Sequence, residues 1–183
     1  MSTVDVRQDA VKAPAPRSRA GEAFNDVLVL VLRLHGSFTA AGETLARPAG
    51  QTLARWVVLD QCRDAPATVS DIARRLRQAR QSVQRVADLL AADGLCAWRD
   101  NPQHQRAKLL ELTPAGRAAL HAIDAAQHEW CDTLGTKIGE PALRRTAAAL
   151  QRITGAVDNT PPARAAQRSP SDLVSEVRPP GQG

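Results

Sequence analysis

The sequence predicts a mostly α-helical protein with one small β-hairpin. Apolar residues recur every three or four positions over most of residues 22–156, which is the spacing of amphipathic helices. Hydrophobic residues make up 43% of the chain and aromatic residues only 3%, so aliphatic side chains that suit helices must build the core. Residues 95–112 depart from this spacing and hold two short runs around a polar turn. A length of 183 residues fits one domain with tails.

The first helix is expected over residues 22–41. It follows an arm, residues 1–20, whose mixture of Ala, Pro, Ser and charged residues predicts disorder. Leu30 and Leu32 lie off the main apolar stripe, so the helix is expected to be buried on more than one side, as at a dimer or domain interface. The stripe itself consists of Phe24, Val27, Leu28, Val31 and Leu34.

A second helix is expected over residues 52–62, after a break that contains Pro48. Thr52 is a good N-cap, because its hydroxyl can accept a hydrogen bond from the first turn. The apolar face of this helix is formed by Leu53, Trp56, Val57 and Leu59.

Two helices joined by a tight turn are expected at residues 68–93. Thr68 and Asp71 have capping-box spacing, with Asp in place of the usual Glu. A break near Gln78 separates them, and Gly94 is a natural residue to end the second. The side chains expected to face the core are Ile72, Ala73, Leu76, Val83, Val86, Leu89 and Leu90.

The remaining elements are a hairpin and two more helices. Residues 95–98 and 107–112 are expected to be strands, with Asn101-Pro102 in the turn between them. Thr113-Pro114 is a strong helix start, and that helix should run to about Gly135. A last helix from Pro141 should end near residue 156, before a disordered tail, residues 157–183.

The stretch between Arg74 and Arg85 carries five arginines and no acid, in a chain of net charge +5 and pI about 9.8. Cations suit phosphates, and Gln and Arg can read adenine and guanine edges in the major groove. A helix-turn-helix followed by a hairpin with a basic tip is the layout of a winged helix that binds duplex DNA. The candidate DNA-binding residues are Arg77, Arg80, Gln81, Ser82, Gln84 and Arg85, with His104 and Arg106 in the wing.

Several stretches of the chain follow a known family pattern, and the most specific is the wing followed by Leu112-Thr-Pro-Ala-Gly116. The other matching stretches are Leu53-Ala-Arg-Trp56-Val-Val-Leu59, Thr68-Val-Ser-Asp-Ile-Ala-Arg-Arg-Leu76, Arg80-Gln-Ser-Val-Gln-Arg85, Asp93-Gly-Leu95, Asp100-Asn-Pro102 and Arg106-Ala-Lys-Leu109. Through them the chain, over about residues 22–156, resembles the MarR family of transcriptional regulators.

The resemblance implies a mostly α winged helix-turn-helix homodimer that occupies a pseudo-palindromic operator as a repressor. Residues 21–156 would form the dimer domain, with the winged helix-turn-helix at about 52–112. Dimerisation would use the helices at about 22–41 and 113–156. Two departures from the family pattern are Ala79, where Ser or Thr usually caps the recognition helix, and Asn101 and His104, where the wing often carries acids.

The resemblance also implies release from DNA by a small aromatic or carboxylate effector. The cleft would be lined by the first, second and fifth helices. Arg55 could pair with a carboxylate and Trp56 could stack on a ring. The candidate ligand residues are His35, Arg55 and Trp56, and for each of them a plain core or surface role stays open.

Two other modes of sensing stay open. Cys62, Cys96 and Cys131 are three scattered cysteines without a CxxC pair, which indicates reduced thiols, and oxidation of one of them would make the protein a redox sensor. A metal-responsive alternative rests on four residues that share one helical face, but no metal site and no cofactor are expected. These four are His121, Asp124, His128 and Cys131.

An enzyme is not expected, because the sequence has no Gly-rich phosphate loop, GxSxG, HExxH or Ser-His-Asp set. A non-specific architectural DNA-binding protein stays open as an alternative. No signal peptide or membrane span is expected, since the longest apolar run is Val27 to Leu32. The expected location is the cytoplasm, in association with the nucleoid.

Overall fold

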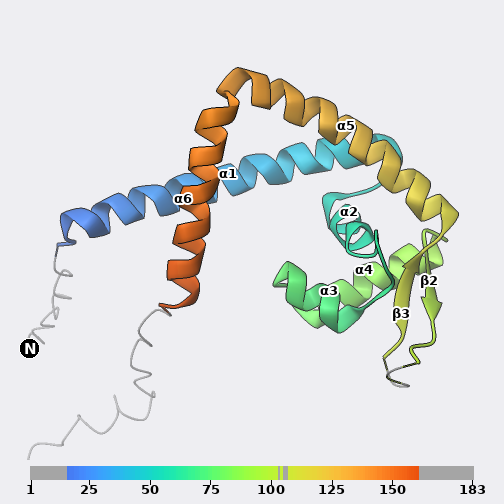
Figure 1. The fold of residues 1–183 in the computed structure, drawn as a ribbon. Coiled ribbons are helices and arrows are strands. Elements are labelled where there is room, and N and C mark those ends of the chain that lie inside the picture. The colour runs from blue at the N-terminus through green and yellow to red at the C-terminus, as the bar shows by residue number, and fades with distance from the viewer. Residues whose placement is uncertain (1–15, 103, 105–106, 161–183) are drawn as a thin grey trace, which may run out of the picture. The chain divides into compact units, whose positions relative to one another are not determined.

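The computed structural model describes residues 16–102, residue 104 and residues 107–160. Figure 1 shows long helices and a small sheet, which confirms the predicted mostly α-helical winged helix-turn-helix fold. The elements are α1 (Arg19–Ala46), η1 (Arg47–Ala49), α2 (Leu53–Asp60), β1 (Ala67–Thr68), α3 (Val69–Leu76), α4 (Arg80–Ala92), β2 (Cys96–Arg99), β3 (Leu109–Leu112), α5 (Pro114–Ile138) and α6 (Glu140–Asp158).

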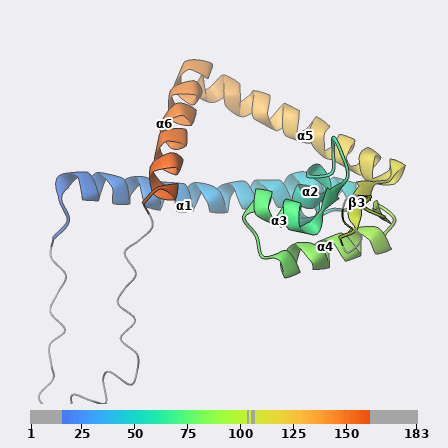
Figure 2. The same cartoon turned by 60° about the horizontal axis from the view of Figure 1, so that its bottom comes forward.

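The chain divides into two compact units within α5, one ending at Glu129 and the other beginning at Trp130. The first unit holds α1 to β3 and the first part of α5, and the second holds the rest of α5 and α6. Both views place α2, α3 and α4 together beside the strands (Figures 1 and 2). The winged helix-turn-helix is therefore contained within the first unit.

Helix α1 is longer at both ends than the sequence predicts. It begins at Arg19, where the Ser18 hydroxyl accepts a hydrogen bond from the N–H of Gly21 at 3.1 Å. The helix continues past Gly42 to Ala46. Gly42 lets α1 approach α2 closely, because a Cβ there would lie 2.7 Å from Leu53 Cδ1. The predicted arm is therefore too long at its end, and its first fifteen residues lie outside the described ones.

Eight large apolar side chains of α1 are exposed in this single chain. Their exposed fractions run from 39% at Val31 to 62% at Leu30 and Leu32. An exposed apolar surface of this extent marks an interaction site. The residues concerned are Phe24, Leu28, Val29, Leu30, Val31, Leu32, Leu34 and Phe38.

The sheet has three antiparallel strands in the order β1-β3-β2. The hairpin pairs Cys96 with Leu112 and Trp98 with Leu110. Strand β1 was not predicted: its two residues carry no periodic signal, and it forms because Ala67 pairs with Leu110 on the far side of β3. The sheet thereby joins the start of α3 to the wing.

The core of the first unit is aliphatic, as the composition predicts. Its fully buried side chains come from α2, α3, α4, β3 and α5, so each of these elements is held through tertiary packing. Complete burial of one such side chain contributes about 1.5–3 kcal/mol. The largest are Leu59, Ile72, Leu90, Leu110, Ile123, Val58 and Val83.

Several predicted boundaries shift by a few residues. Helix α2 ends at Asp60 instead of Cys62, and α5 continues to Ile138 instead of Gly135. Helix α6 runs to Asp158, so the tail predicted from residue 157 begins too early, and residues 161–183 lie outside the described part. Among the described helices, none has the length and apolar character needed to span a bilayer.

Candidate nucleic-acid interface

Helix α3 starts at a side-chain cap. The Thr68 hydroxyl accepts a hydrogen bond from the backbone N–H of Asp71 at 3.1 Å, and donates one to Asp71 Oδ2 at 2.7 Å. The Asp71 carboxylate therefore bonds the hydroxyl and not the backbone N–H of a standard capping box. Together with the nearby Arg74 and Arg75 charges, this hydroxyl bond holds the pKa of Asp71 below its ordinary value.

The turn between α3 and α4 depends on a left-handed residue. Arg77 has φ 52° and ψ 39°, a conformation that costs a residue with a Cβ about 1 kcal/mol. Its backbone N–H bonds the carbonyls of Ala73 and Arg74, which ends α3. Ala79 then begins α4 without a side-chain cap, so first-turn N–H groups stay open to an acceptor such as a phosphate.

Helix α4 has a buried face and an exposed basic face. Val83, Ala87 and Leu90 are buried, whereas Leu89 is 50% exposed, so the prediction that Leu89 faces the core is wrong. Gln84 is half-buried. The remaining candidates on this helix, Arg80, Gln81, Ser82 and Arg85, are all exposed.

Two hollows flank the exposed face of α4. The first has a volume of about 430 Å³ and is lined by residues of α3, α4 and the wing, among them Ser70, Arg80 and Lys108. The second, of about 860 Å³, runs along α4 itself and includes Gln81 and Arg85. Arg80, Gln84 and Asp88 line both hollows, so these three residues form the ridge between them.

The base of the wing is held by an ion pair across its strands. Arg99 Nε lies 2.6 Å from Glu111 Oε2, and these side chains belong to β2 and β3. His104 is exposed and lies beside a hollow of about 460 Å³ that also includes Arg75. Arg106, the other wing candidate, lies outside the described residues.

The three candidate ligand residues are not brought together. Arg55 lies in α2 and bonds Asp93, at the end of α4, with 2.6 Å between its guanidinium and the carboxylate. Trp56 lines a separate hollow of about 330 Å³ with Asp60 and Gln127, whereas His35 is an exposed residue of α1. Arg55 thus joins two helices of the winged domain and does not line the Trp56 hollow.

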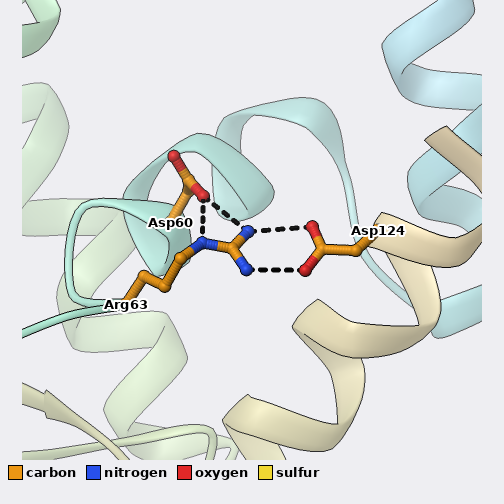
Figure 3. A network of polar contacts seen from close by, with 3 residues as sticks. All are labelled: Asp60, Arg63 and Asp124. Atoms are coloured by element: carbon orange, nitrogen blue, oxygen red, sulfur yellow. Dashed lines mark hydrogen bonds and ion pairs between the residues drawn. The ribbon is translucent and has the colours of Figure 1, made fainter. Parts of the chain in front are cut away.

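A polar network ties the end of α2 to α5 (Figure 3). Arg63 donates two hydrogen bonds to Asp124, at 2.6 and 2.8 Å, and two to Asp60 Oδ1, at 2.9 and 2.8 Å. The bonds from Arg63 lower the pKa of Asp124, and the two carboxylates raise that of Arg63. A partly exposed bidentate pair contributes on the order of 1 kcal/mol.

This network weakens the metal alternative. Both carboxylate oxygens of Asp124 accept hydrogen bonds from Arg63, so the central member of the predicted ligand face is occupied by a cation. Within the described ranges, no cluster of three or more His, Cys, Asp or Glu side chains is arranged to hold a metal ion.

The cysteines divide into two buried thiols and one exposed thiol. Burial raises the pKa of Cys62 to about 11 and that of Cys96 to about 12. Because the thiolate is the reactive form, neither thiol is suited to oxidation sensing. Cys131 in α5 is exposed.

We expect one thiol of the native protein to react quickly with a disulfide reagent such as Ellman's at pH 8. The fast reaction should disappear in Cys131→Ser and persist in Cys62→Ser, and all three thiols should react once the chain is unfolded. Rapid native labelling of Cys62 or Cys96 would contradict the burial described here and restore the redox alternative.

Sequence reasoning missed three residues of the candidate interface, Ser70, Asp88 and Lys108. All three line the hollow between α4 and the wing. Of the three, only Asp88 could have been predicted from the sequence, because it lies one helical turn after Gln84 and so shares its face of α4. Ser70 and Lys108 are brought to the hollow by the pairing of β1 with β3. This pairing joins distant residues, so local sequence patterns do not predict it.

Comparisons with known proteins agree with this geometry. A family model described as MarR family matches residues 49–107, from the end of η1 to the wing. A Mycobacterium tuberculosis protein, Rv2011c, is 39% identical over 123 residues, which cover 67% of this chain and 86% of the relative.

Two solved structures share the fold. The M. tuberculosis transcriptional regulator MosR in complex with DNA is 25% identical, with a TM-score of 0.57, over 70% of this chain and 96% of MosR. Staphylococcus aureus MarR, in complex with salicylate and kanamycin, is 14% identical, with a TM-score of 0.68, over 78% of this chain and 97% of that protein. The predicted resemblance is confirmed, and the chain belongs to the MarR family of DNA-binding transcription regulators.

Proposed function

We propose that this protein is a sequence-specific transcriptional repressor that binds a pseudo-palindromic operator as a homodimer. Helix α4 would enter the major groove and the wing would follow the adjacent backbone or minor groove. The proposed DNA contacts are Arg77, Arg80, Gln81, Ser82, Gln84, Arg85, His104 and Arg106. Action on DNA in this way would place the protein in the cytoplasm, with the nucleoid.

The observation that carries the proposal is the exposed face of α4. Arg80 and Arg85 supply cations, and Gln81 and Gln84 supply amides that can bond base edges, all on one helix that protrudes between two hollows. The first turn of this helix also lacks a side-chain cap, which leaves N–H groups for a phosphate. A non-specific architectural protein has no need of amides on this ridge.

The dimer is supported by the apolar surface of α1. Phe24, Leu30 and Leu32 are each about half exposed or more, which is unfavourable in water unless another apolar surface covers them. A second copy presents the same surface, and a two-fold pair would set two α4 helices about one turn of DNA apart.

Release by a small molecule is proposed for the hollow beside Trp56. It is lined by Leu53, Trp56 and Val57 from α2, and by Asp60, Gln61, Leu76 and Gln127. Trp56 is a core residue with 9% of its surface exposed, so it offers this hollow only a small part of its ring. Because Arg55 bonds Asp93 elsewhere, we infer that an effector would contact this part of the ring and bond the polar side chains, without an arginine to hold a carboxylate. An aromatic ring remains the expected feature of such an effector.

The test is selection of binding sites from a random-sequence duplex library with the purified full-length protein. We expect an inverted repeat whose half-sites are centred about 10–11 base pairs apart. We expect affinity for it to exceed that for unrelated duplex by roughly a thousandfold or more. Enrichment of no motif would contradict sequence-specific regulation, and a single unrepeated half-site would contradict the dimer.

A further inference from the structure

Asp88 is an acidic residue on the face of α4 that is proposed to meet DNA. It is exposed, and it lines the hollow between α4 and the wing together with Arg80, Gln84 and Lys108. A carboxylate in this position repels phosphates and weakens binding to any duplex, whatever its sequence. Asp88 therefore does not contribute to the affinity of this surface for DNA, and its hydrogen bond indicates its role.

Asp88 bonds a neighbouring side chain on the ridge between the two hollows. Gln84 Nε2 donates a hydrogen bond to Asp88 Oδ1 at 3.0 Å, between residues one helical turn apart. Gln84 is half-buried and lines the hollows on both sides of the ridge. Asp88, which lines both hollows as well, thus acts on the glutamine of this ridge, whereas Gln81 lines only the second hollow.

An ionised carboxylate accepts hydrogen bonds and donates none. The NH₂ group of Gln84 must then face Asp88, and its Oε1 must face away. Nε2 keeps a second hydrogen, so the amide presents one acceptor and one donor in a fixed order. This is the pair that bonds N6 and N7 of adenine in the major groove. An Asn at position 88 would accept either orientation of the amide and would fix neither.

We propose that Asp88 is a positioning residue for base recognition, which orients the Gln84 amide so that it reads adenine. The proposal rests on the proposed function, since it requires α4 to lie in the major groove. Asp88 thereby lowers affinity for all DNA and raises discrimination at one position of each half-site.

The experiment compares Asp88→Asn, Asp88→Ala and Gln84→Ala with the wild type on the selected operator and on its complete set of single-base variants. Asp64→Asn is the matched control, because it removes the same charge from an exposed loop residue that does not line the hollow. Circular dichroism and melting temperature establish that each variant is folded.

We expect both Asp88 variants to lose about tenfold of discrimination for adenine at one position per half-site, with the other positions unchanged. Gln84→Ala should lose it at the same position, and adding Asp88→Asn to Gln84→Ala should cause no further loss, as expected for two groups that act as one. Affinity for unrelated duplex should rise in the Asp88 variants, and Asp64→Asn should keep the full base preference.

Three results would overturn the proposal. Asp88 variants that keep the wild-type base preference would leave this residue a solvated charge. If the Asp88 variants lost base preference at a position that Gln84→Ala does not affect, Asp88 would not act through Gln84. If the wild-type protein showed no base preference, both the proposed function and this inference would be wrong. Either of the first two results would leave the proposed function intact.

Discussion

Gly116→Ala is expected to cost the protein about 3 kcal/mol or more of unfolding free energy, a large part of the usual total of about 5–15 kcal/mol. Gly116 is buried in the first turn of α5, and a Cβ on it would lie 2.0 Å from the backbone carbonyl oxygen of Leu95. A backbone atom cannot rotate out of the way as a side chain does. The melting temperature should fall by roughly 10 °C.

The carbonyl of Leu95 has little freedom to move because it serves the same junction. It accepts a hydrogen bond from the Thr113 backbone N–H at 3.1 Å. The Thr113 hydroxyl has one hydrogen to donate, and it lies 2.7 Å from the Gly94 carbonyl oxygen and 3.0 Å from that of Leu95. The Gly116 N–H in turn bonds that hydroxyl at 3.1 Å. Displacing Leu95 would break the bonds that attach the start of α5 to the end of the α4–β2 turn.

Gly135→Ala is the matched control, in the same helix. A Cβ at Gly135 would meet no atom within 4 Å, and alanine favours a helix over glycine by about 1 kcal/mol. This variant should melt at or above the wild-type temperature. If Gly116→Ala melted within about a degree of the wild type, the junction described here would be wrong.

The junction also explains the most specific stretch of the sequence. Leu112-Thr-Pro-Ala-Gly116 carried the family resemblance, and the structure assigns its parts structural tasks. Leu112 is buried, Thr113 caps α5, and Gly116 admits the Leu95 carbonyl. The pattern of this stretch therefore reflects the packing of the wing against the start of α5.

The sequence predicted best what depends on neighbours in the chain. Thr52 and Thr68 cap α2 and α3 as expected, because an N-cap bond reaches three residues ahead. The exposure of Arg80, Gln81 and Arg85 on α4 followed from helical spacing alone. The prediction that Leu89 is buried was wrong, because the buried face of α4 runs through the smaller Ala87 and leaves Leu89 exposed.

The remainder depends on contacts between distant residues. Arg55 looked like a free cation for a ligand, but Asp93 lies 38 positions away in sequence and binds it. Arg63 and Asp124, 61 positions apart, form the Figure 3 network in the same way. Neither periodicity nor spacing predicts pairs of residues so far apart. The residues that line the proposed effector hollow therefore could not be predicted from the sequence.

Replacing both Arg80 and Arg85 by alanine is expected to reduce affinity for the selected operator by a hundredfold or more at fixed salt. Each arginine contact with a base or phosphate accounts for about 1–3 kcal/mol, and a dimer loses both from each half-site. The dependence of affinity on salt should also weaken, with a slope smaller by about 0.9 for every phosphate contact removed. Fluorescence anisotropy over a series of salt concentrations measures both effects.

Arg144→Ala with Arg145→Ala is the control for net charge, because it removes two arginines from α6, outside the helix-turn-helix. It should change operator affinity by less than about threefold, because neither arginine belongs to α4 or to the wing. Both double variants should keep the wild-type melting temperature within a few degrees, because Arg80, Arg85, Arg144 and Arg145 are exposed.

Two results would contradict this prediction. Equal losses of operator affinity in the two double variants would mean that the arginines of α4 act only through the overall charge of the protein. No loss in either variant would mean that another surface binds the operator.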